Sequence, residues 1–436
     1  MKRVFFILSF LLSIIACTNN TDLIEEIQEE VNTSQPRNAI SIEDALKLLS
    51  AYEDVPAKSS NKQIENIVYI PNPNYDAGTK SNNTQNEDNP YLLYVVNYED
   101  DGGYVVLSAD KRLPTDIYAI TESGNIDETD IYGQDEEDYP ISLLYQSARG
   151  HIPGTDTTTT DPTLPDPGEP FDPNPPIDLE TGEWIVTTWG PWRAYESVPT
   201  MLPTKWHQNS PFNDNVQPLL AGCTSIALLQ VLAYNAYPTN HFINQFHIPY
   251  HLLKYQEEIL PGTPYAQSVA LFVEQFHNMR QDYHISGNST LIFPDQARDH
   301  MEWLGYENVV LHRYGSDCDM STIFSSLDNN YPILISAMAE QLTSGGHSWV
   351  IDGYRKERRY GAKYGEETGD YYGQDMEERF LVHCNWGWIN GDHNGYFYAG
   401  IFDPNQPVVP DPSQQNNNPN LYNRFYRVIT YRVPGY

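Results

Sequence analysis

The sequence predicts an α+β protein in which helices and strands occupy separate stretches of the chain. In the C-terminal half, the strongest helical patterns precede most of the strand-like runs, whereas a βαβ order would alternate them. The N-terminal part combines one short helix with several strand-like runs, and a Pro-rich stretch separates the two parts. The 436 residues are enough for two or three domains.

Composition excludes some function classes. The chain has 25 Lys and Arg against 59 Asp and Glu, a formal net charge of −34. Such a surface repels phosphate groups, which argues against nucleic acid as a partner. Aromatic residues reach 13%, whereas disordered acidic chains are poor in them, so we expect a mostly folded protein. Four cysteines are too few for a disulfide-built scaffold.

The N-terminus has the pattern of an export signal. Two basic residues precede the apolar run Val4–Ile15, which fits a signal-peptide core and is too short to cross a bilayer. The run ends in a small residue followed by Cys17, which resembles the lipobox of bacterial lipoproteins, whose cysteine is lipidated. We therefore expect a membrane anchor at Cys17 and a bacterial cell-envelope location, with the acidic residues that follow favouring the outer membrane or cell surface. An ordinary signal peptide with a chance cysteine is the alternative.

Shifts in composition divide the chain into five segments. Residues 151–179 are rich in Pro and contain no Lys or Arg, which is typical of an extended, protease-accessible linker. The predicted segments are a signal peptide (1–17), a tether (18–40), an N-terminal domain (41–148), a linker (149–182) and a C-terminal domain (183–436).

The N-terminal domain is predicted to begin with a short helix that Ser41 caps. Glu99–Gly102 separates two strand-like runs and is typical of a hairpin turn. The predicted strands of this domain are Ile67–Ile70, Tyr91–Tyr98, Gly103–Ser108 and Ile117–Ile120.

The C-terminal domain is predicted to contain a buried helix over Thr224–Tyr237, because this segment is apolar nearly all round. Further helices are expected near Tyr265–Arg280 and Asp295–Leu304. The long, charged and Tyr/Gly-rich segment Arg355–Glu378 is predicted to be a loop. The predicted strands are Val309–Arg313, Pro332–Met338, Ser348–Tyr354, Arg379–Trp386 and Gly395–Phe402.

Four residue types in a fixed order suggest nucleophilic catalysis. Cys223 starts the buried helix, where a helix N-terminus stabilises a thiolate. His347 follows two glycines and leads into a strand, and the side-chain carbonyl of Asn385 can orient its imidazole while Trp386 shields that bond. Gln208, upstream of the cysteine, can help to bind an oxyanion. Each residue alone also fits a structural role, but together they occur in the Gln–Cys–His–Asn order of papain-type enzymes.

On the motifs WHQNSPFN, AGCTSIALLQVLAY, GGHSWVIDGY and NWGW followed by NGYF, the chain resembles the streptopain (C10) family of papain-like cysteine proteases. The resemblance implies a papain-like fold and an extracytoplasmic cysteine endopeptidase that acts on proteins or peptides and needs no cofactor. It further implies that Cys223 is the nucleophile, His347 the base and Gln208 part of the oxyanion hole, with Asn385 and Trp386 supporting the histidine.

The resemblance extends into the N-terminal domain. Gly102–Asp110 (GGYVVLSAD) is similar to the motif that ends the family's prodomain, and Leu92–Asn97 is similar to the strand before it. This implies a small α+β prodomain that inhibits the catalytic domain of the same chain until the linker is cleaved. A lipid anchor and the long linker would distinguish the protein from a freely secreted relative.

Several alternatives stay open. Cys318 and Cys384 can pair in an oxidising compartment, although sequence does not give their separation. A zinc site from His383, Cys384 and His393 matches no standard spacing, so no metal is predicted. Asp352 is a second candidate to orient the catalytic histidine, but its odd spacing along the strand points it to the opposite face. The rival functions are a non-catalytic Tyr/Trp-rich binding lipoprotein and an inactive relative that inhibits a partner protease.

Overall fold

The computed structural model describes residues 38–52, 63–73, 75, 89–127, 129–130, 139–152, 185–279, 284–286, 289–338, 346–365, 367–402 and 424–435. Cys17, the signal peptide and most of the predicted tether and linker lie outside these residues, so the expectations about them stay predictions. Within the described ranges, no helix is both long enough and apolar enough to cross a membrane.

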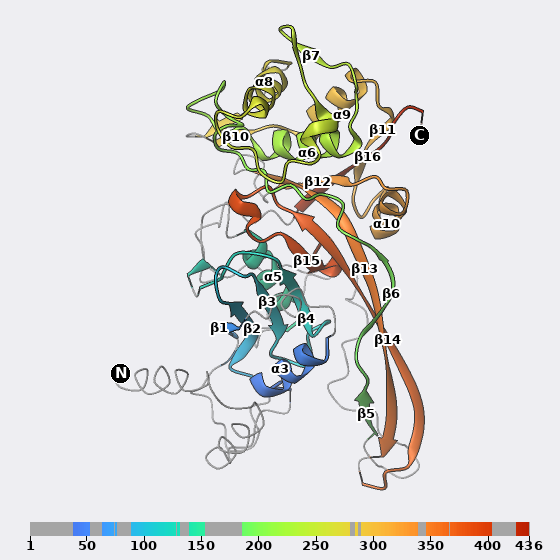
Figure 1. Cartoon of the computed structure of the whole chain (residues 1–436). Helices are drawn as coiled ribbons and strands as arrows, with labels where there is room; N and C mark the ends of the chain where they lie inside the picture. Colours follow the sequence, from blue (N-terminus) through green and yellow to red (C-terminus); the bar gives the residue numbers. More distant parts are fainter. Residues whose placement is uncertain are drawn as a thin grey trace, which may run out of the picture.

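A twelve-stranded antiparallel sheet runs through both parts of the chain (Figure 1). Its main path follows the order β1-β2-β3-β4-β15-β14-β13-β12-β16-β11, and β5 and β6 pair with β13 off this path. The strands pair antiparallel and the helices gather in separate regions of the molecule, which agrees with the predicted α+β class. The strands of the N-terminal part are β1 (Ile64–Pro71), β2 (Tyr91–Tyr98), β3 (Tyr104–Ser108) and β4 (Ile117–Thr121).

The C-terminal part supplies the other strands of this sheet. They are β5 (Ile185–Trp189), β6 (Arg193–Val198), β11 (Glu307–Arg313), β12 (Ile333–Met338), β13 (Gly346–Gly365), β14 (Tyr371–Asn385), β15 (Gly395–Tyr398) and β16 (Arg424–Arg432). Two small hairpins lie apart from it, β7 (Phe242–Ile243) with β8 (Phe246–His247), and β9 (His284–Ser286) with β10 (Ser289–Leu291).

Helices cover the sheet at both ends. In the N-terminal part these are α3 (Ile42–Ala51) and α5 (Tyr139–Gly150). In the C-terminal part they are α6 (Cys223–Asn235), α7 (Tyr250–Leu253), α8 (Pro264–Met279), α9 (Pro294–Trp303) and α10 (Met320–Asp328), with the 3₁₀ turns η4 (Ile389–Gly391) and η5 (Ala399–Phe402). The Ser41 side chain caps α3 as predicted, accepting a bond from the Asp44 N–H. Helices α5 and α10 and strand β16 were not predicted from the sequence.

The prediction of a loop over Arg355–Glu378 is wrong. Strands β13 and β14 continue through this segment as a long extension, and β5 and β6 pair along the other edge of β13. We call this extension the hairpin arm and define it as residues 354–365 and 371–382. Ion pairs between its strands stabilise it where apolar alternation is weak. These are Arg358–Glu378 at 2.9 Å, Arg359–Glu377 at 2.6 Å and Lys363–Asp375 at 2.8 Å.

The end of the predicted strand Gly395–Phe402 also differs from expectation. Only Gly395–Tyr398 forms β15, and the remaining residues form the turn η5. Strand β15 is where the two parts of the chain meet, because it pairs with β4 of the N-terminal part. A side chain at Gly395 would collide with the backbone of Ile120 on β4, so this crossing requires glycine.

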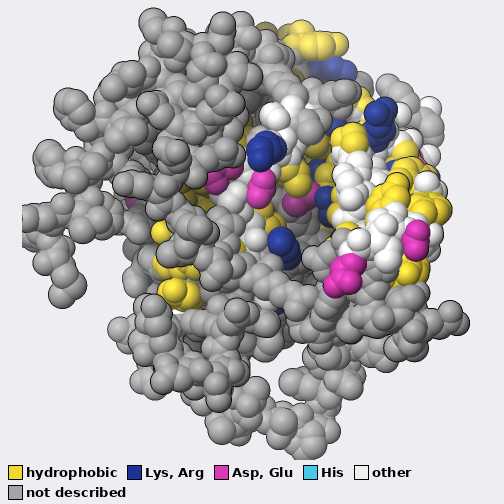
Figure 2. Space-filling view, turned by 90° about the horizontal axis from the view of Figure 1, so that it is seen from below, with side chains coloured by type: hydrophobic (Ala, Val, Ile, Leu, Met, Phe, Trp, Pro, Cys, Tyr) yellow, Lys and Arg dark blue, Asp and Glu magenta, His cyan; other side chains and the backbone are white. Residues whose placement is uncertain are grey.

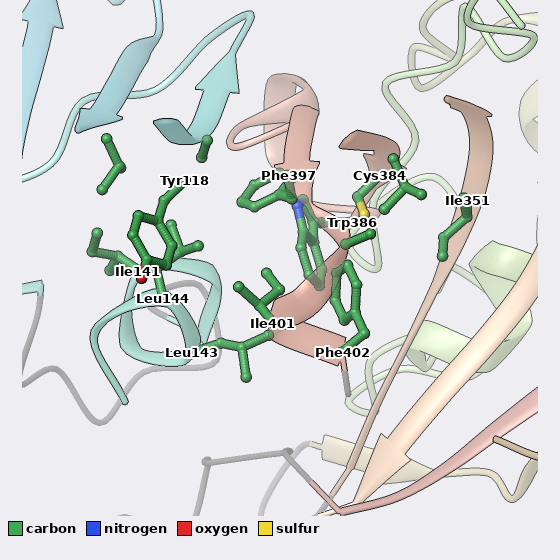
Figure 3. Close-up of a cluster of buried hydrophobic side chains, with 14 of the residues drawn as sticks. Tyr118, Ile141, Leu143, Leu144, Ile351, Cys384, Trp386, Phe397, Ile401 and Phe402 are labelled. Carbon is green, nitrogen blue, oxygen red and sulfur yellow. The ribbon is translucent and has the colours of Figure 1, made fainter. Parts of the chain in front are cut away.

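The two parts also share one hydrophobic core. Figure 3 shows side chains of α5 and β4 directed toward aromatic residues of the C-terminal part. Each of the contacting side chains is at most 5% exposed. They are Tyr118, Ile141, Leu143 and Leu144 on one side and Trp386, Phe397, Ile401 and Phe402 on the other. The N-terminal part is therefore built onto the C-terminal part through both main-chain pairing and apolar burial.

We expect Leu144→Ala to lower stability by about 2–5 kcal/mol, because it leaves a cavity in this shared core. Leu260→Ala is the matched control, since Leu260 is 60% exposed, and it should change stability by less than about 0.5 kcal/mol. Urea unfolding followed by tryptophan fluorescence measures both. Equal effects of the two substitutions would contradict a shared core.

Candidate active site

Cys223 is the first residue of helix α6, close to where the sequence predicts the helix to begin. The residue before it, Gly222, has φ +84°, and an added Cβ would lie 3.3 Å from the Thr290 carbonyl oxygen. Only glycine adopts this conformation at little cost. Eleven residues of α6, including Cys223, are buried, so the thiol is fixed by a helix anchored in the core.

Two contacts hold the segment leading into the helix. The Ala221 N–H donates to the carbonyl oxygen of Gln208 at 2.9 Å, which brings the predicted oxyanion-hole residue beside the start of α6. His277 Nε2 lies 2.8 Å from the Ala221 carbonyl oxygen, and burial lowers the pKa of this histidine although the hydrogen bond opposes the shift. His277 was not singled out from the sequence, because it lies within the apolar pattern of α8.

The start of β13 lies directly against the thiol. The Ser348 N–H donates to Cys223 Sγ at 3.3 Å. The hydroxyl of Ser348 lies 2.8 Å from that of Thr224 on the helix and 2.8 Å from that of Ser336 on β12. A buried hydroxyl chain thus ties the helix start to two strands, and none of these three residues was singled out from the sequence.

The imidazole of His347 lies among tryptophan rings. Its Nε2 lies 2.9 Å from the Trp386 carbonyl oxygen, which requires the Nε2–H tautomer, and its ring stacks on Trp388 at 4.3 Å. Burial lowers the pKa of His347 to about 3, although the hydrogen bond to Trp386 opposes this shift. The residue is therefore a neutral imidazole in this arrangement.

Strand alternation explains this position. Successive residues of a strand point to opposite faces of the sheet. Ser348 and Val350 face α6 and its core, whereas His347 and Trp349 face the core shared with the N-terminal part. The structure therefore places the backbone N–H of Ser348, the neighbour of His347, against Cys223 Sγ, while the His347 ring lies on the aromatic face of the sheet.

Asn385 lies on the face of the sheet that contains the thiol. It pairs across the strands with Val350, and its side-chain NH₂ donates to the Thr204 carbonyl oxygen at 2.6 Å. The expected contact with His347 is not formed. Among the described residues, no donor reaches the buried Asn385 Oδ1. Trp386, the next residue, points to the opposite face and packs in the shared core.

Asp352 was a second candidate to orient His347, but its carboxylate contacts His383 instead. Its Oδ1 lies 2.6 Å from His383 Nδ1, and its Oδ2 accepts the N–H groups of Met201 and Leu202. Glu122 of the N-terminal part lies 3.5 Å from His383 Nε2. Burial alone lowers the pKa of His383, but the Asp352 and Glu122 carboxylates outweigh it and raise the pKa to about 10.

The remaining candidates do not form a metal site or a disulfide. Cys318 and Cys384 are not joined, and burial raises the pKa of both thiols, to about 11 for Cys318. His383 is paired with a carboxylate, and His393 Nδ1 lies 3.1 Å from the hydroxyl of Tyr104. Within the described ranges, no group of three or more His, Cys, Asp or Glu side chains could hold a metal ion.

Two family models match the chain. Residues 206–397 match the model described as Peptidase C10 family, which includes Gln208, Cys223, His347, Asn385 and Trp386. Residues 37–135 match the model described as Spi protease inhibitor, which includes most of the described N-terminal part. A search of curated proteins found no match.

The buried His383–Asp352 pair predicts a pH dependence of stability. Because the pKa of His383 is about 10 when folded and about 6.5 when unfolded, the folded state binds more protons between these values. Its stabilising contribution is complete below pH 6.5 and is lost as the pH rises toward 10, by at most about 1.4 kcal/mol per pH unit. Urea midpoints measured from pH 6.5 to 8 should therefore fall.

The double variant Asp352→Asn, His383→Gln keeps a hydrogen-bonded pair without the titrating group, and should show a flatter profile. His251→Gln is the control, because His251 is exposed on α7 and should leave the slope unchanged. An unchanged slope in the double variant would contradict the assignment.

Proposed function

We propose that this chain, which belongs to the peptidase C10 family of cysteine peptidases and carries an Spi protease inhibitor-like N-terminal part, is an extracytoplasmic cysteine endopeptidase made as a zymogen. One observation carries the proposal. Cys223 is fixed at the first position of a buried helix, against the backbone of the strand that carries His347.

The proposed reaction proceeds through a thioester. His347 takes the proton of the Cys223 thiol, and the thiolate attacks a peptide carbonyl carbon. Gln208 and the Cys223 N–H stabilise the oxyanion. The C–N bond then breaks as the His347 imidazolium protonates the leaving amine. Water, with His347 as base, hydrolyses the thioester and restores the thiol.

The packing around His347 supports a zymogen in which the N-terminal part restrains the catalytic histidine. In the proposed reaction the His347 imidazole acts on the Cys223 thiol, on the face of the sheet toward α6. The buried Asn385 Oδ1 lies on that face and would accept an imidazole N–H there. Since the N-terminal part completes the core that now holds the ring, its departure would remove packing that favours the present orientation.

Cys223→Ala should lower peptide hydrolysis by at least about 10³-fold, because it removes the nucleophile. Cys318→Ala is the matched control and should stay within a few-fold of the unchanged protein, since Cys318 is a buried thiol with a raised pKa. Casein cleavage by purified protein measures both. Wild-type activity of the Cys223→Ala protein would refute the assignment, and processing of that protein at the wild-type rate would point to a separate maturation enzyme.

We further propose that the protein is held in the bacterial cell envelope by a lipid on Cys17, with the outer membrane as the favoured site. The support is the basic, apolar and cysteine-terminated N-terminal sequence. The proposed partners are protein or peptide substrates, which an exported peptidase meets outside the cytoplasm.

Labelled palmitate should be incorporated into the full chain in a bacterial host and should be lost in Cys17→Ser. Globomycin should block processing of the signal peptide in the unchanged chain. Incorporation in Cys17→Ser would exclude this anchor, and Cys318→Ser is the control that should retain label.

A further inference from the structure

The hairpin arm carries a cluster of arginines on the face toward the N-terminal part. Arg355 and Arg359 lie on β13, and Arg379 lies opposite Glu357 on β14. Trp192, immediately before β6, stacks under two of the guanidinium groups, with its ring 4.3 Å from Arg379 Cζ and 4.6 Å from Arg359 Cζ. We call Trp192, Arg355, Arg359 and Arg379 the arginine site. Viewed from below, the described surface shows basic, acidic and hydrophobic side chains intermixed (Figure 2).

A single carboxylate of the N-terminal part fits into this site. Asp116 Oδ2 accepts from Arg359 Nη1 at 3.0 Å and from Trp192 Nε1 at 2.7 Å, and its Oδ1 accepts from Arg379 Nη1. The Asp116 side chain is 11% exposed and that of Arg379 is 1% exposed. Three donors from three segments of the C-terminal part therefore converge on one part-buried carboxylate.

An aromatic residue of the N-terminal part completes the contact. The Tyr52 ring lies 5.3 Å from Arg355 Cζ and 5.3 Å from Arg379 Cζ, within the range of cation–π attraction. Its hydroxyl donates to the carboxylate of Glu357, which also accepts from Arg379 at 2.8 Å. The site thus recognises a carboxylate beside a phenol, from two segments far apart in the N-terminal sequence.

Charge balance indicates what this contact does. Glu357 is fully buried and is shared between Arg355 and Arg379, while Arg359 also pairs with the half-exposed Glu377. Without Asp116, the buried guanidinium of Arg379 would retain Glu357 alone for its neutralisation. Departure of the N-terminal part must break these charge-assisted hydrogen bonds, and close charge pairs of this kind slow dissociation.

We propose that the arginine site is an exosite, distant in the sequence from Cys223, that keeps the N-terminal part bound after the linker is cut. This inference rests on the proposed zymogen function and names the contact that sets the lifetime of the inhibited state. The sheet pairing and the shared core align the two parts, and the arginine site makes their dissociation slow.

The test uses the full chain with Cys223→Ala, so that no catalysis is needed, and with the recognition sequence of a site-specific protease inserted between residues 153 and 184. After cleavage, the protein is immobilised through a C-terminal tag and release of the N-terminal fragment is followed over time. The unvaried fragment should stay bound. Asp116→Asn should release about 30-fold faster or more, because it removes the charge and keeps the size of the side chain.

Asp101→Asn is the matched control. Asp101 is exposed in the turn after β2 with φ +55°, a conformation that Asn tolerates, so release should be unchanged. Arg359→Gln changes the partner of Asp116 in the C-terminal part. It provides the test of the exosite if circular dichroism shows that Asp116→Asn does not fold. The two substitutions should be non-additive in the double variant, which a general loss of stability would not produce.

Two results would overturn the proposal. The first is release from Asp116→Asn and Arg359→Gln at the rate of the Asp101→Asn control, which would assign retention to the shared core alone. The second is immediate separation of the unvaried fragments. Peptidase activity of the chain that retains Cys223 is measured separately. Its absence would refute the proposed function while leaving the release rates, and hence the exosite, to be judged by themselves.

Discussion

The pairing of β4 with β15 is the interaction on which the rest of the arrangement depends. It extends the sheet of the C-terminal part into the N-terminal part and places α5 over Trp386 and Phe397. The aromatic face on which His347 stacks is thereby the inner surface of a core that belongs to both parts. Taking the two parts away from each other would expose that face and leave β15 as an edge strand, so the position of the histidine and the docking of the N-terminal part have a common physical basis.

Because successive side chains of a strand point to opposite faces, the residues of the candidate site lie on both faces of the sheet. His347 and Ser348 are neighbours, as are Asn385 and Trp386, yet each pair is split between the two faces of the sheet. The face toward α6 holds the thiol, the Ser348 N–H and the Asn385 amide, whereas the other face holds the imidazole.

Sequence reasoning succeeded where a local pattern determines structure. The buried helix beginning near Cys223 and the strand Tyr91–Tyr98 follow from apolar patterning and turn signals in neighbouring residues. It failed for the hairpin arm, because charged residues on both strands read as a loop until their cross-strand partners are known. The orientation of His347 also could not be predicted, since it depends on register against β12 and on Trp388, which is distant along the chain. The order of the candidate residues along the chain was recognised from the sequence, but their distribution over the two faces of the sheet could not be predicted.

The hairpin arm carries a local basic cluster that the net charge of the chain does not reveal. The whole chain carries a formal net charge of −34, yet arginines concentrate on one face of the arm, where they meet a carboxylate of the N-terminal part. In a strongly acidic protein, a basic site of this kind discriminates between docking surfaces, because most of the remaining surface is of the wrong sign to repeat the contact. Apolar burial gives the two parts a reason to associate, while Asp116 and Tyr52 fix how they do so, because they contact the buried Arg379 and Glu357 from two separate segments. Local charge complementarity, rather than net charge, therefore specifies the assembly of the precursor.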